Sequence, residues 1–255
     1  MKSIGLALSG GGARGIAHLG VLQAFDHLGI EISALSGTSS GAIAGAFYAS
    51  GVAPQEVLEI IKKTKLLLFV RPAISMTGLL KLQKLQVLFS KHLPFHSFQE
   101  LPKKLTINAT DVKKGESKYF DEGDLIPAIL ASSCMPVIFD PLVIDGVSYI
   151  DGGILNNLPV EPLQPTCDLI IGSHCNPVDR EFRVKNAKAL LERTFLMAIR
   201  NNTLHRQQQC NLFIEPPALG KYIGSDFDKA SEIYQIGYDY TMGMKDNILS
   251  LKNNK

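Results

Sequence analysis

The chain alternates short apolar runs with longer helical patterns, and this alternation constrains its fold more than any other feature. Apolar runs of strand length cover residues 4–9, 32–36, 104–110, 167–173 and 211–216. Helical patterns cover residues 16–29, 40–50, 185–208 and 228–251. This order is typical of parallel strands whose connecting helices cover both faces of a sheet. We therefore predict an α/β fold with a mainly parallel central sheet.

The composition is that of a globular protein with one large core. The 255 residues are 45% hydrophobic and 20% charged, and we find no internal repeat, low-complexity tract or linker. We therefore expect residues 1–255 to form a single domain, with its motifs in residues 4–160. The formal net charge of +2 argues against a nucleic-acid-binding protein, because such proteins usually present a concentrated basic surface.

The sequence contains no evident membrane span or metal motif. No stretch approaches the roughly 20 apolar residues that cross a bilayer, and the run from Ile4 to Leu8 is too short for a signal peptide. We therefore expect a cytoplasmic protein. The four cysteines form no CxxC pair, so we expect no metal and no cofactor. His174 beside Cys175 is more simply explained as a pair of core residues than as half of a metal site.

A glycine-rich loop follows the first predicted strand, in the stretch LSGGGARGIAHLG at residues 8–20. Gly10, Gly12 and Gly15 satisfy the G-x-G-x-x-G pattern of dinucleotide sites, between a strand and a helix. Those sites also need an acidic residue at the end of the second strand. Here Glu31 lies at the beginning of that strand, so the nucleotide interpretation lacks its second anchor.

The second predicted strand ends instead in Gly37-Thr38-Ser39-Ser40-Gly41, which matches the G-x-S-x-G nucleophile elbow. A side chain at either glycine would collide with the neighbouring strand or block the sharp turn. The alternative is that Thr38 or Ser39 simply caps the following helix. Because neighbouring parallel strands end at the same edge of a sheet, we expect Ser39 to lie beside the loop 9–15.

The glycine-rich loop is well suited to hold a transient negative charge. Backbone N–H groups of Gly10, Gly11 and Gly12 at a helix N-terminus can bind the oxyanion of a tetrahedral acyl intermediate. Arg14 either orders this loop and adds positive potential, or is a solvated side chain at the start of the helix.

A serine nucleophile needs a base, and the stretch PLVIDGVSYIDGG at residues 141–153 offers one. Asp145-Gly146 predicts a two-residue type I′ hairpin turn, and the second arm ends at Asp151. Direct contact with the serine, and a pKa raised by burial, would let Asp151 act without an imidazole. Alternatively, Asp151 is the middle member of a triad with His174 or His205, or an ordinary turn residue.

Residues 60–99 form a basic segment without any acidic residue. Its positive charges are Lys62, Lys63, Lys65, Arg71, Lys81, Lys84 and Lys91. Its apolar residues at helical spacing are Leu79, Leu82, Leu85, Leu88 and Phe89. Such a helix can lie on an anionic lipid surface and act as a lid. The default interpretation is a helix whose leucines lie in the core and whose lysines lie in water.

Together these residues resemble the patatin-like phospholipase family. Four blocks occur in the family's order, namely GGGARG at 10–15, GTSSG at 37–41, ASSCMPVIFDP at 131–141 and DGG at 151–153, with NNLP following at 156–159. The resemblance implies a three-layer α/β/α sandwich that is distinct from the α/β-hydrolase fold. Residues 161–255 carry no motif of this family.

The resemblance also implies the roles of the site residues. Ser39 would be the nucleophile and Asp151 its general base, in a Ser-Asp dyad without a catalytic histidine. The oxyanion hole would come from the main chain around Gly11 and Gly12, within the loop Gly10, Gly11, Gly12, Ala13, Arg14 and Gly15. The remaining implied residues are Gly37, Thr38, Ser40 and Gly41 of the elbow, and Gly152 and Gly153 beside the base.

The activity implied by the resemblance is hydrolysis of carboxylic esters of lipids, phospholipid or lysophospholipid, through an acyl-enzyme and without a metal. The closest branch is that of small bacterial patatin-like acyl hydrolases. The expected partners are the lipid substrate and, transiently, a membrane surface. Two alternatives stay open: an acyltransferase that uses the same serine, and a nucleotide-binding or lipid-binding protein without catalysis. Acyl length, head group and oligomeric state do not follow from the sequence.

Overall fold

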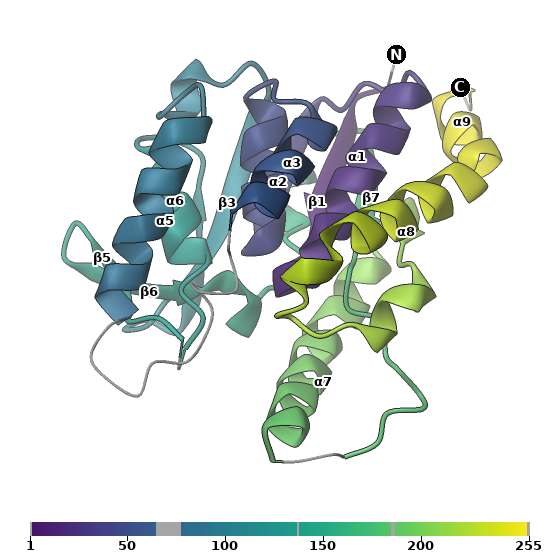
Figure 1. Cartoon of the computed structure of the whole chain (residues 1–255). Coiled ribbons are helices and arrows are strands. Elements are labelled where there is room, and N and C mark those ends of the chain that lie inside the picture. The colour runs from purple at the N-terminus through teal and green to yellow at the C-terminus, as the bar shows by residue number, and fades with distance from the viewer. Residues whose placement is uncertain (1, 65–77, 137, 185–186, 254–255) are drawn as a thin grey trace.

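The fold is built on one central sheet, in a computed structural model that describes residues 2–64, 78–136, 138–184 and 187–253 (Figure 1). Eight strands form the sheet in these residues, in the order β5-β6-β3-β2-β1-β7-β8, with β4 beside β3. The parallel strands are β1 (Ile4–Leu8), β2 (Ala34–Thr38), β3 (Lys104–Asp111), β7 (Leu169–Ser173) and β8 (Leu212–Ile214). The antiparallel strands are β4 (Glu116–Phe120), β5 (Leu142–Ile144) and β6 (Val147–Asp151).

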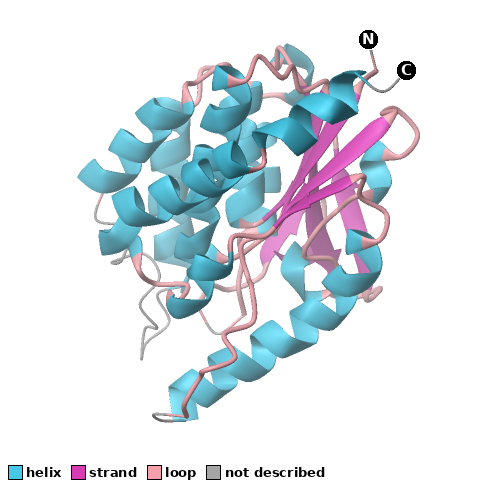
Figure 2. Ribbon diagram, turned by 90° about the vertical axis from the view of Figure 1, so that its right-hand side faces the viewer, coloured by secondary structure: helices cyan, strands magenta, loops and turns pink. Residues whose placement is uncertain are grey.

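Most helices gather on one face of this sheet, as Figure 2 shows from the side. The helices are α1 (Ala17–His27), α2 (Ser40–Ala49), α3 (Pro54–Lys63), α5 (Gly78–His92), α6 (Leu125–Ser132), α7 (Ala187–Gln207), α8 (Ala230–Gly243) and α9 (Lys245–Asn253). The opposite face is covered more thinly, where Leu158, Val160 and Leu163 pack on Ala7 and Ile170. The predicted α/β fold with a mainly parallel sheet, layered between helices, is confirmed.

The predicted elements mostly appear where the apolar patterns placed them. The strand predicted at 32–36 begins two residues later, and the helix predicted at 228–251 divides into α8 and α9. Three elements were not predicted, namely α3, α6 and β4. Strand β4 has the sequence ESKYF, whose polar character gives no sign of a strand.

The hairpin turn predicted at Asp145-Gly146 is confirmed. Asp145 has φ 49° and Gly146 has φ 78°, and both values lie in the left-handed region that a type I′ turn requires. The turn joins β5 to β6, in which Ile144 pairs with Val147. The second arm of the hairpin then carries the chain to Asp151.

Strands β2 and β6 meet end to end along one edge of β3. Strand β4 pairs with residues 107–111 of β3, β2 pairs with 104–108, and β6 pairs with 109–111. Because β4 overlaps both of the other strands, β2 and β6 must share the opposite edge. Thr38 is therefore opposite Asn108 and Asp151 is opposite the next residue, Ala109. The ends of the two strands are thus held side by side.

Helix α5 contains the apolar stripe of the basic segment. Leu82 and Phe89 are buried, Leu85 and Leu88 are partly buried, and the Phe89 ring packs edge-on against Phe47. The default interpretation, with the stripe in the core, is therefore confirmed for these residues. The side chains of Leu79 and Lys81, and all of 65–77, lie outside the described residues. A role of this segment as a lid stays a prediction.

Within the part of the chain that the structure describes, the helices are too short or too polar to cross a membrane.

Candidate active site

Ser39 lies on a strained turn between β2 and α2. Its φ of 53° and ψ of −120° are unusual for a residue with a side chain. The turn is so tight that only glycine fits on either side of it. A Cβ atom at Gly37 would lie 2.6 Å from the backbone nitrogen of Ala42, and one at Gly41 would overlap the carbonyl of Leu8. The Ser39 side chain makes no capping hydrogen bond to α2. The sequence interpretation of Ser39 as a helix cap is therefore wrong.

A second serine holds this turn to the sheet. The Ser39 backbone N–H donates to Ser132 Oγ at 2.8 Å, and Ser132 Oγ donates to the Asn108 carbonyl at 2.7 Å. Ser132 lies at the end of α6, within the block 131–141. Its supporting role was missed because a serine at the end of an apolar helix gives no signal of what it contacts.

Asp151 ends β6 as a buried carboxylate beside Ser39. The Gly153 N–H donates to Asp151 Oδ1 at 2.7 Å. Burial raises the pKa of Asp151 to about 6, although the Gly153 N–H and the nearby Ser39 hydroxyl favour the ionised carboxylate and oppose this shift. The structure therefore brings together the two residues that the sequence analysis singled out.

Asn108 fixes the turn that follows Asp151. The buried Asn108 side chain donates from Nδ2 to the carbonyls of Gly152 at 3.2 Å and Asn156 at 2.7 Å. A Cβ atom at Gly152 would overlap the Asn108 carbonyl, so only glycine fits there. Strand β3 thus positions Asp151 through its backbone and through the Asn108 amide.

The glycine-rich loop lies directly over Ser39. A Cβ atom at Gly10 would lie 3.2 Å from the Ser39 Cβ. The Gly10 N–H donates to the Asn157 carbonyl at 3.2 Å and the Ala13 N–H donates to the Gly224 carbonyl at 2.9 Å. In contrast, the amides of Gly11 and Gly12 donate no hydrogen bond to any described residue. These two amides are therefore available for a ligand.

Two residues that follow β7, Cys175 and Asn176, hold the glycine-rich loop through hydrogen bonds. Asn176 Nδ2 donates to the Gly10 carbonyl at 2.6 Å, and the Cys175 N–H donates to Ser9 Oγ at 3.0 Å. A Cβ atom at Gly11 would overlap Cys175 Sγ. The sequence analysis missed Asn176, although the rule that parallel strands end at one edge places it beside the loop.

Arg14 is buried beneath the loop, so its interpretation as a solvated side chain is wrong. Its charge helps to lower the pKa of His174, and it opposes the burial that raises the pKa of Cys175 to about 11. The guanidinium is therefore a buried positive charge near His174 and Cys175.

The buried histidines, His18 and His174, make their hydrogen bonds with residues other than Asp151. His18 bonds the Ser9 carbonyl through Nε2 and Ser173 Oγ through Nδ1, both at 2.8 Å, and burial lowers its pKa to about 4. His174 donates from Nδ1 to Glu215 at 2.7 Å. His205 lies exposed on α7. The described contacts of Asp151 include none of these rings, so the geometry gives no support to a triad.

Among the described residues, no three His, Cys, Asp or Glu side chains lie close enough together to hold a metal ion.

Comparisons with known proteins match this part of the chain to one family. The family model for patatin-like phospholipase matches residues 6–163, a range that contains the glycine-rich loop, the elbow and Asp151. An uncharacterized NTE family protein of Mycobacterium tuberculosis is 35% identical over 162 residues, which cover 63% of this chain and 45% of the relative. A lysophospholipase of Kluyveromyces lactis is 27% identical over 280 residues, 94% of this chain and 19% of that protein. The chain thus spans less than half the length of these relatives.

Solved structures share the fold at low sequence identity. VipD from Legionella pneumophila matches with a TM-score of 0.56 and 17% identity, over 96% of this chain and 67% of VipD. Human GIVD cytosolic phospholipase A2, in complex with methyl gamma-linolenyl fluorophosphonate, matches with a TM-score of 0.54 and 12% identity, over 98% and 58% of the two chains.

Proposed function

The chain belongs to the patatin-like phospholipase family, and on this premise we propose that it hydrolyses carboxylic esters of lipids through a dyad of Ser39 and Asp151. The observation that carries the proposal is that the turn at Ser39 and the buried carboxylate of Asp151 follow strand ends that pair with consecutive residues of β3, beside the free amides of Gly11 and Gly12. Phospholipids and lysophospholipids are the proposed substrates, because one relative is a lysophospholipase and one structural neighbour is a phospholipase A2.

In the first half of the proposed reaction, Ser39 Oγ attacks the ester carbonyl carbon while its proton passes to Asp151. The carbonyl oxygen becomes an oxyanion, which accepts hydrogen bonds from the amides of Gly11 and Gly12. Each such donor typically stabilises the transition state by about 3 kcal/mol. The bond to the leaving alcohol then breaks, and the alcohol takes the proton from Asp151, leaving an acyl group on Ser39.

In the second half, a water molecule loses its proton to Asp151 and attacks the acyl carbon. The tetrahedral intermediate collapses, the fatty acid leaves, and the proton returns to Ser39 Oγ. A carboxylate can perform both transfers because burial brings its pKa to about 6, close to the working pH. An ordinary exposed aspartate would be a much weaker base.

Covalent labelling tests the proposed nucleophile. We expect a fluorophosphonate to add to the wild-type protein once, on the peptide that contains Ser39, and to abolish ester hydrolysis. The Ser39→Ala variant should take no label. Ser40→Ala is the matched control, because the Ser40 hydroxyl is buried without a hydrogen-bond partner in the described structure and its removal should leave labelling intact.

The products of lysophospholipid turnover distinguish hydrolysis from transfer of the acyl group to another alcohol. We expect one free fatty acid for each alcohol released from a lysophospholipid. Recovery of the acyl group on a second alcohol would instead identify an acyltransferase, and a lipid that binds without any turnover would identify a binding protein.

The pH dependence of activity should report the base. Only ionised Asp151 can accept the serine proton, so we expect kcat/KM to be constant above about pH 7 and to fall tenfold per pH unit below about pH 6. The profile should be unchanged in His205→Asn. An inflection that is lost with His205 or with His174 would support a triad and contradict the dyad.

A further inference from the structure

Helix α7 presents an apolar stripe to solvent that the proposed reaction does not use. The stripe consists of Leu190, Met197 and Leu204, which are 48%, 55% and 44% exposed. These residues recur every seven positions, about two helical turns, so they lie along one side of the helix. Figures 1 and 2 show α7 extending away from the other helices, below the sheet.

The opposite side of α7 is anchored in the protein. Ile199 and Thr203, four residues apart, are buried, and Arg206 Nε donates to Glu161 at 2.7 Å. The orientation of the helix is therefore fixed, and its apolar stripe faces outward in the folded protein. Polar residues lie between the three apolar side chains on this side of the helix, namely Arg193, Thr194, Arg200 and Asn201, so the outward surface is amphipathic.

Arginines border this stripe. Arg193 and Arg200 are also seven residues apart, and at 100° per residue they lie along one flank of it. The Arg193 guanidinium stacks over the Phe182 ring at 5.1 Å and donates to the Asp179 carbonyl at 2.9 Å. These contacts hold residues 177–184 against the helix.

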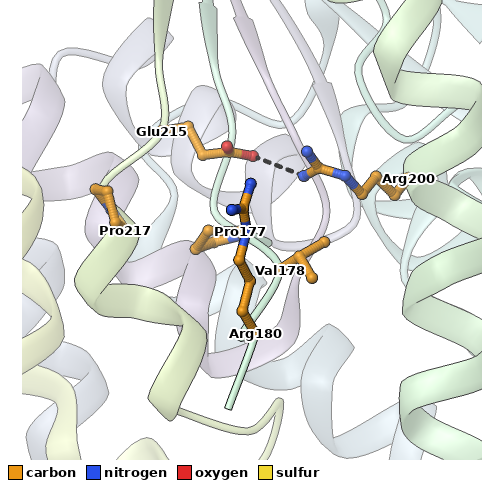
Figure 3. A pocket seen from close by; sticks show the side chains of 6 residues that line it. All are labelled: Pro177, Val178, Arg180, Arg200, Glu215 and Pro217. Carbon is orange, nitrogen blue, oxygen red and sulfur yellow. Dashed lines mark hydrogen bonds and ion pairs between the residues drawn. The ribbon is translucent and has the colours of Figure 1, made fainter. Parts of the chain in front are cut away.

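Arg200 and part of the segment 177–184 line a cavity of about 360 Å³ (Figure 3). Its walls are Pro177, Val178, Arg180, Arg200, Glu215 and Pro217. The Glu215 carboxylate lies 3.5 Å from Arg200 and 2.7 Å from His174, so it is already shared by two partners. Arg180 has no ion-pair partner among the described residues. The cavity therefore carries a surplus of positive charge.

The cavity opens at the edge of the sheet that carries Ser39. Apart from Arg200 on α7, its residues follow the carboxyl ends of β7 and β8, which run parallel to β1 and β2. Pro177 directly follows Asn176, whose side chain holds the Gly10 carbonyl beside Ser39. A surface that binds this stripe and this cavity would therefore lie against the same edge of the sheet as the nucleophile.

We propose that α7 and residues 177–184, here called the α7 surface, dock the protein on an anionic lipid bilayer. The apolar stripe enters the interface, while Arg180 and Arg200 hold a lipid phosphate at the cavity. An apolar stripe bordered by arginines is complementary to a bilayer whose headgroups are negative. Helix α5 is less suited, because Leu82 and Phe89 of its own stripe are buried. The proposal extends the proposed function. It depends on that function in one respect only, namely that lipid bound at the α7 surface is delivered to Ser39.

Vesicle flotation tests the α7 surface, with the full chain carrying Ser39→Ala so that the lipid stays intact. We expect binding to phosphatidylcholine vesicles that contain phosphatidylglycerol, and weaker binding to phosphatidylcholine alone. Leu190→Gln with Met197→Gln should weaken binding to both vesicles by about tenfold or more. Arg180→Gln with Arg200→Gln should remove the preference for phosphatidylglycerol.

The matched control is Val87→Gln with Val143→Gln, at positions on α5 and β5 that are 68% and 61% exposed. These changes should leave binding unchanged, and all variants should keep the parent melting temperature within about 2 °C. Equal binding by the α7 variant and the control would overturn the proposal. The proposal would also be overturned if the wild type were a dimer that the α7 substitutions dissociate and the control substitutions do not. Binding of inorganic phosphate without binding of vesicles would overturn it as well. Failure of ester hydrolysis, in contrast, would contradict the dyad and leave the flotation result standing.

Discussion

Replacing Asp151 with asparagine is expected to lower kcat by about 10⁴-fold while leaving the fold at least as stable. Asparagine has the same shape, and its amide oxygen can still accept from the Gly153 N–H, but it cannot take a proton from Ser39. We therefore expect the turn to persist and the chemistry to fail. The measurement is single-turnover hydrolysis of a soluble ester, together with the rate of fluorophosphonate labelling.

The same variant should change how stability depends on pH. Burial raises the folded-state pKa of Asp151 to about 6, above its ordinary value of 3.8, so folding favours the protonated acid. That contribution to stability is complete below about pH 4 and is lost as the pH rises through about 6. The total loss is about 3 kcal/mol at higher pH.

Asparagine does not ionise, so Asp151→Asn should unfold at the same urea concentration as the wild type at about pH 4. At about pH 8 it should be more stable than the wild type by up to about 3 kcal/mol. Equal stabilities at both pH values would contradict the raised pKa, whereas retained turnover would contradict the role of Asp151 as base.

Gly41→Ala is expected to destabilise the fold by about 4 kcal/mol or more. The added methyl group would meet only backbone atoms, with the Leu8 carbonyl carbon at 2.6 Å and the Ser9 carbonyl oxygen at 2.7 Å. Leu8 belongs to β1, which is hydrogen-bonded to strands on both sides and cannot move aside. Urea unfolding and the yield of soluble protein measure this effect.

Gly243→Ala is the control for this substitution. Gly243 is exposed at the end of α8, and a Cβ atom there would meet nothing within 4 Å. Alanine should leave stability unchanged or raise it by up to about 1 kcal/mol, because it favours the helix. A folded, active Gly41→Ala protein would mean that the elbow is less compressed than its contacts indicate.

The sequence predicted the chemistry-bearing edge of the sheet well, for a simple physical reason. The loop 9–15 and the turn at Ser39 follow neighbouring parallel strands, and such strands end at the same edge. The Asp-Gly turn at 145–146 likewise requires positive φ angles that few other residues tolerate. In each case, a local rule was sufficient.

The parts that could not be predicted depend on contacts between distant segments. Nothing in the residues of β6 indicates that it shares an edge of β3 with β2, because that arrangement depends on β4 occupying the other edge. The supporting role of Ser132 has the same origin. It follows from which backbone groups the fold brings within reach, and no spacing in the sequence encodes this.

The two helices with apolar stripes show a further limit of periodicity. Leu82 and Phe89 of α5 point into the core, whereas Leu190 and Met197 of α7 point into solvent. A repeat of apolar residues establishes that a helix has a distinct side, but the neighbouring elements decide what that side contacts. We therefore propose α7, rather than the basic segment 60–99, as the surface that contacts a membrane.

Strand β3 holds the ends of β2 and β6 at consecutive residues, and this has a consequence for how few side chains the proposed reaction requires. In a serine triad, the acid serves mainly to orient and stabilise the imidazole base. Here the proposed base is itself an acid fixed by the hydrogen-bond ladder of the sheet, opposite Ala109, one position from the strand end that carries the proposed nucleophile. In the proposed reaction the main chain would thus perform the aligning task of a third catalytic group, so that two side chains would be enough.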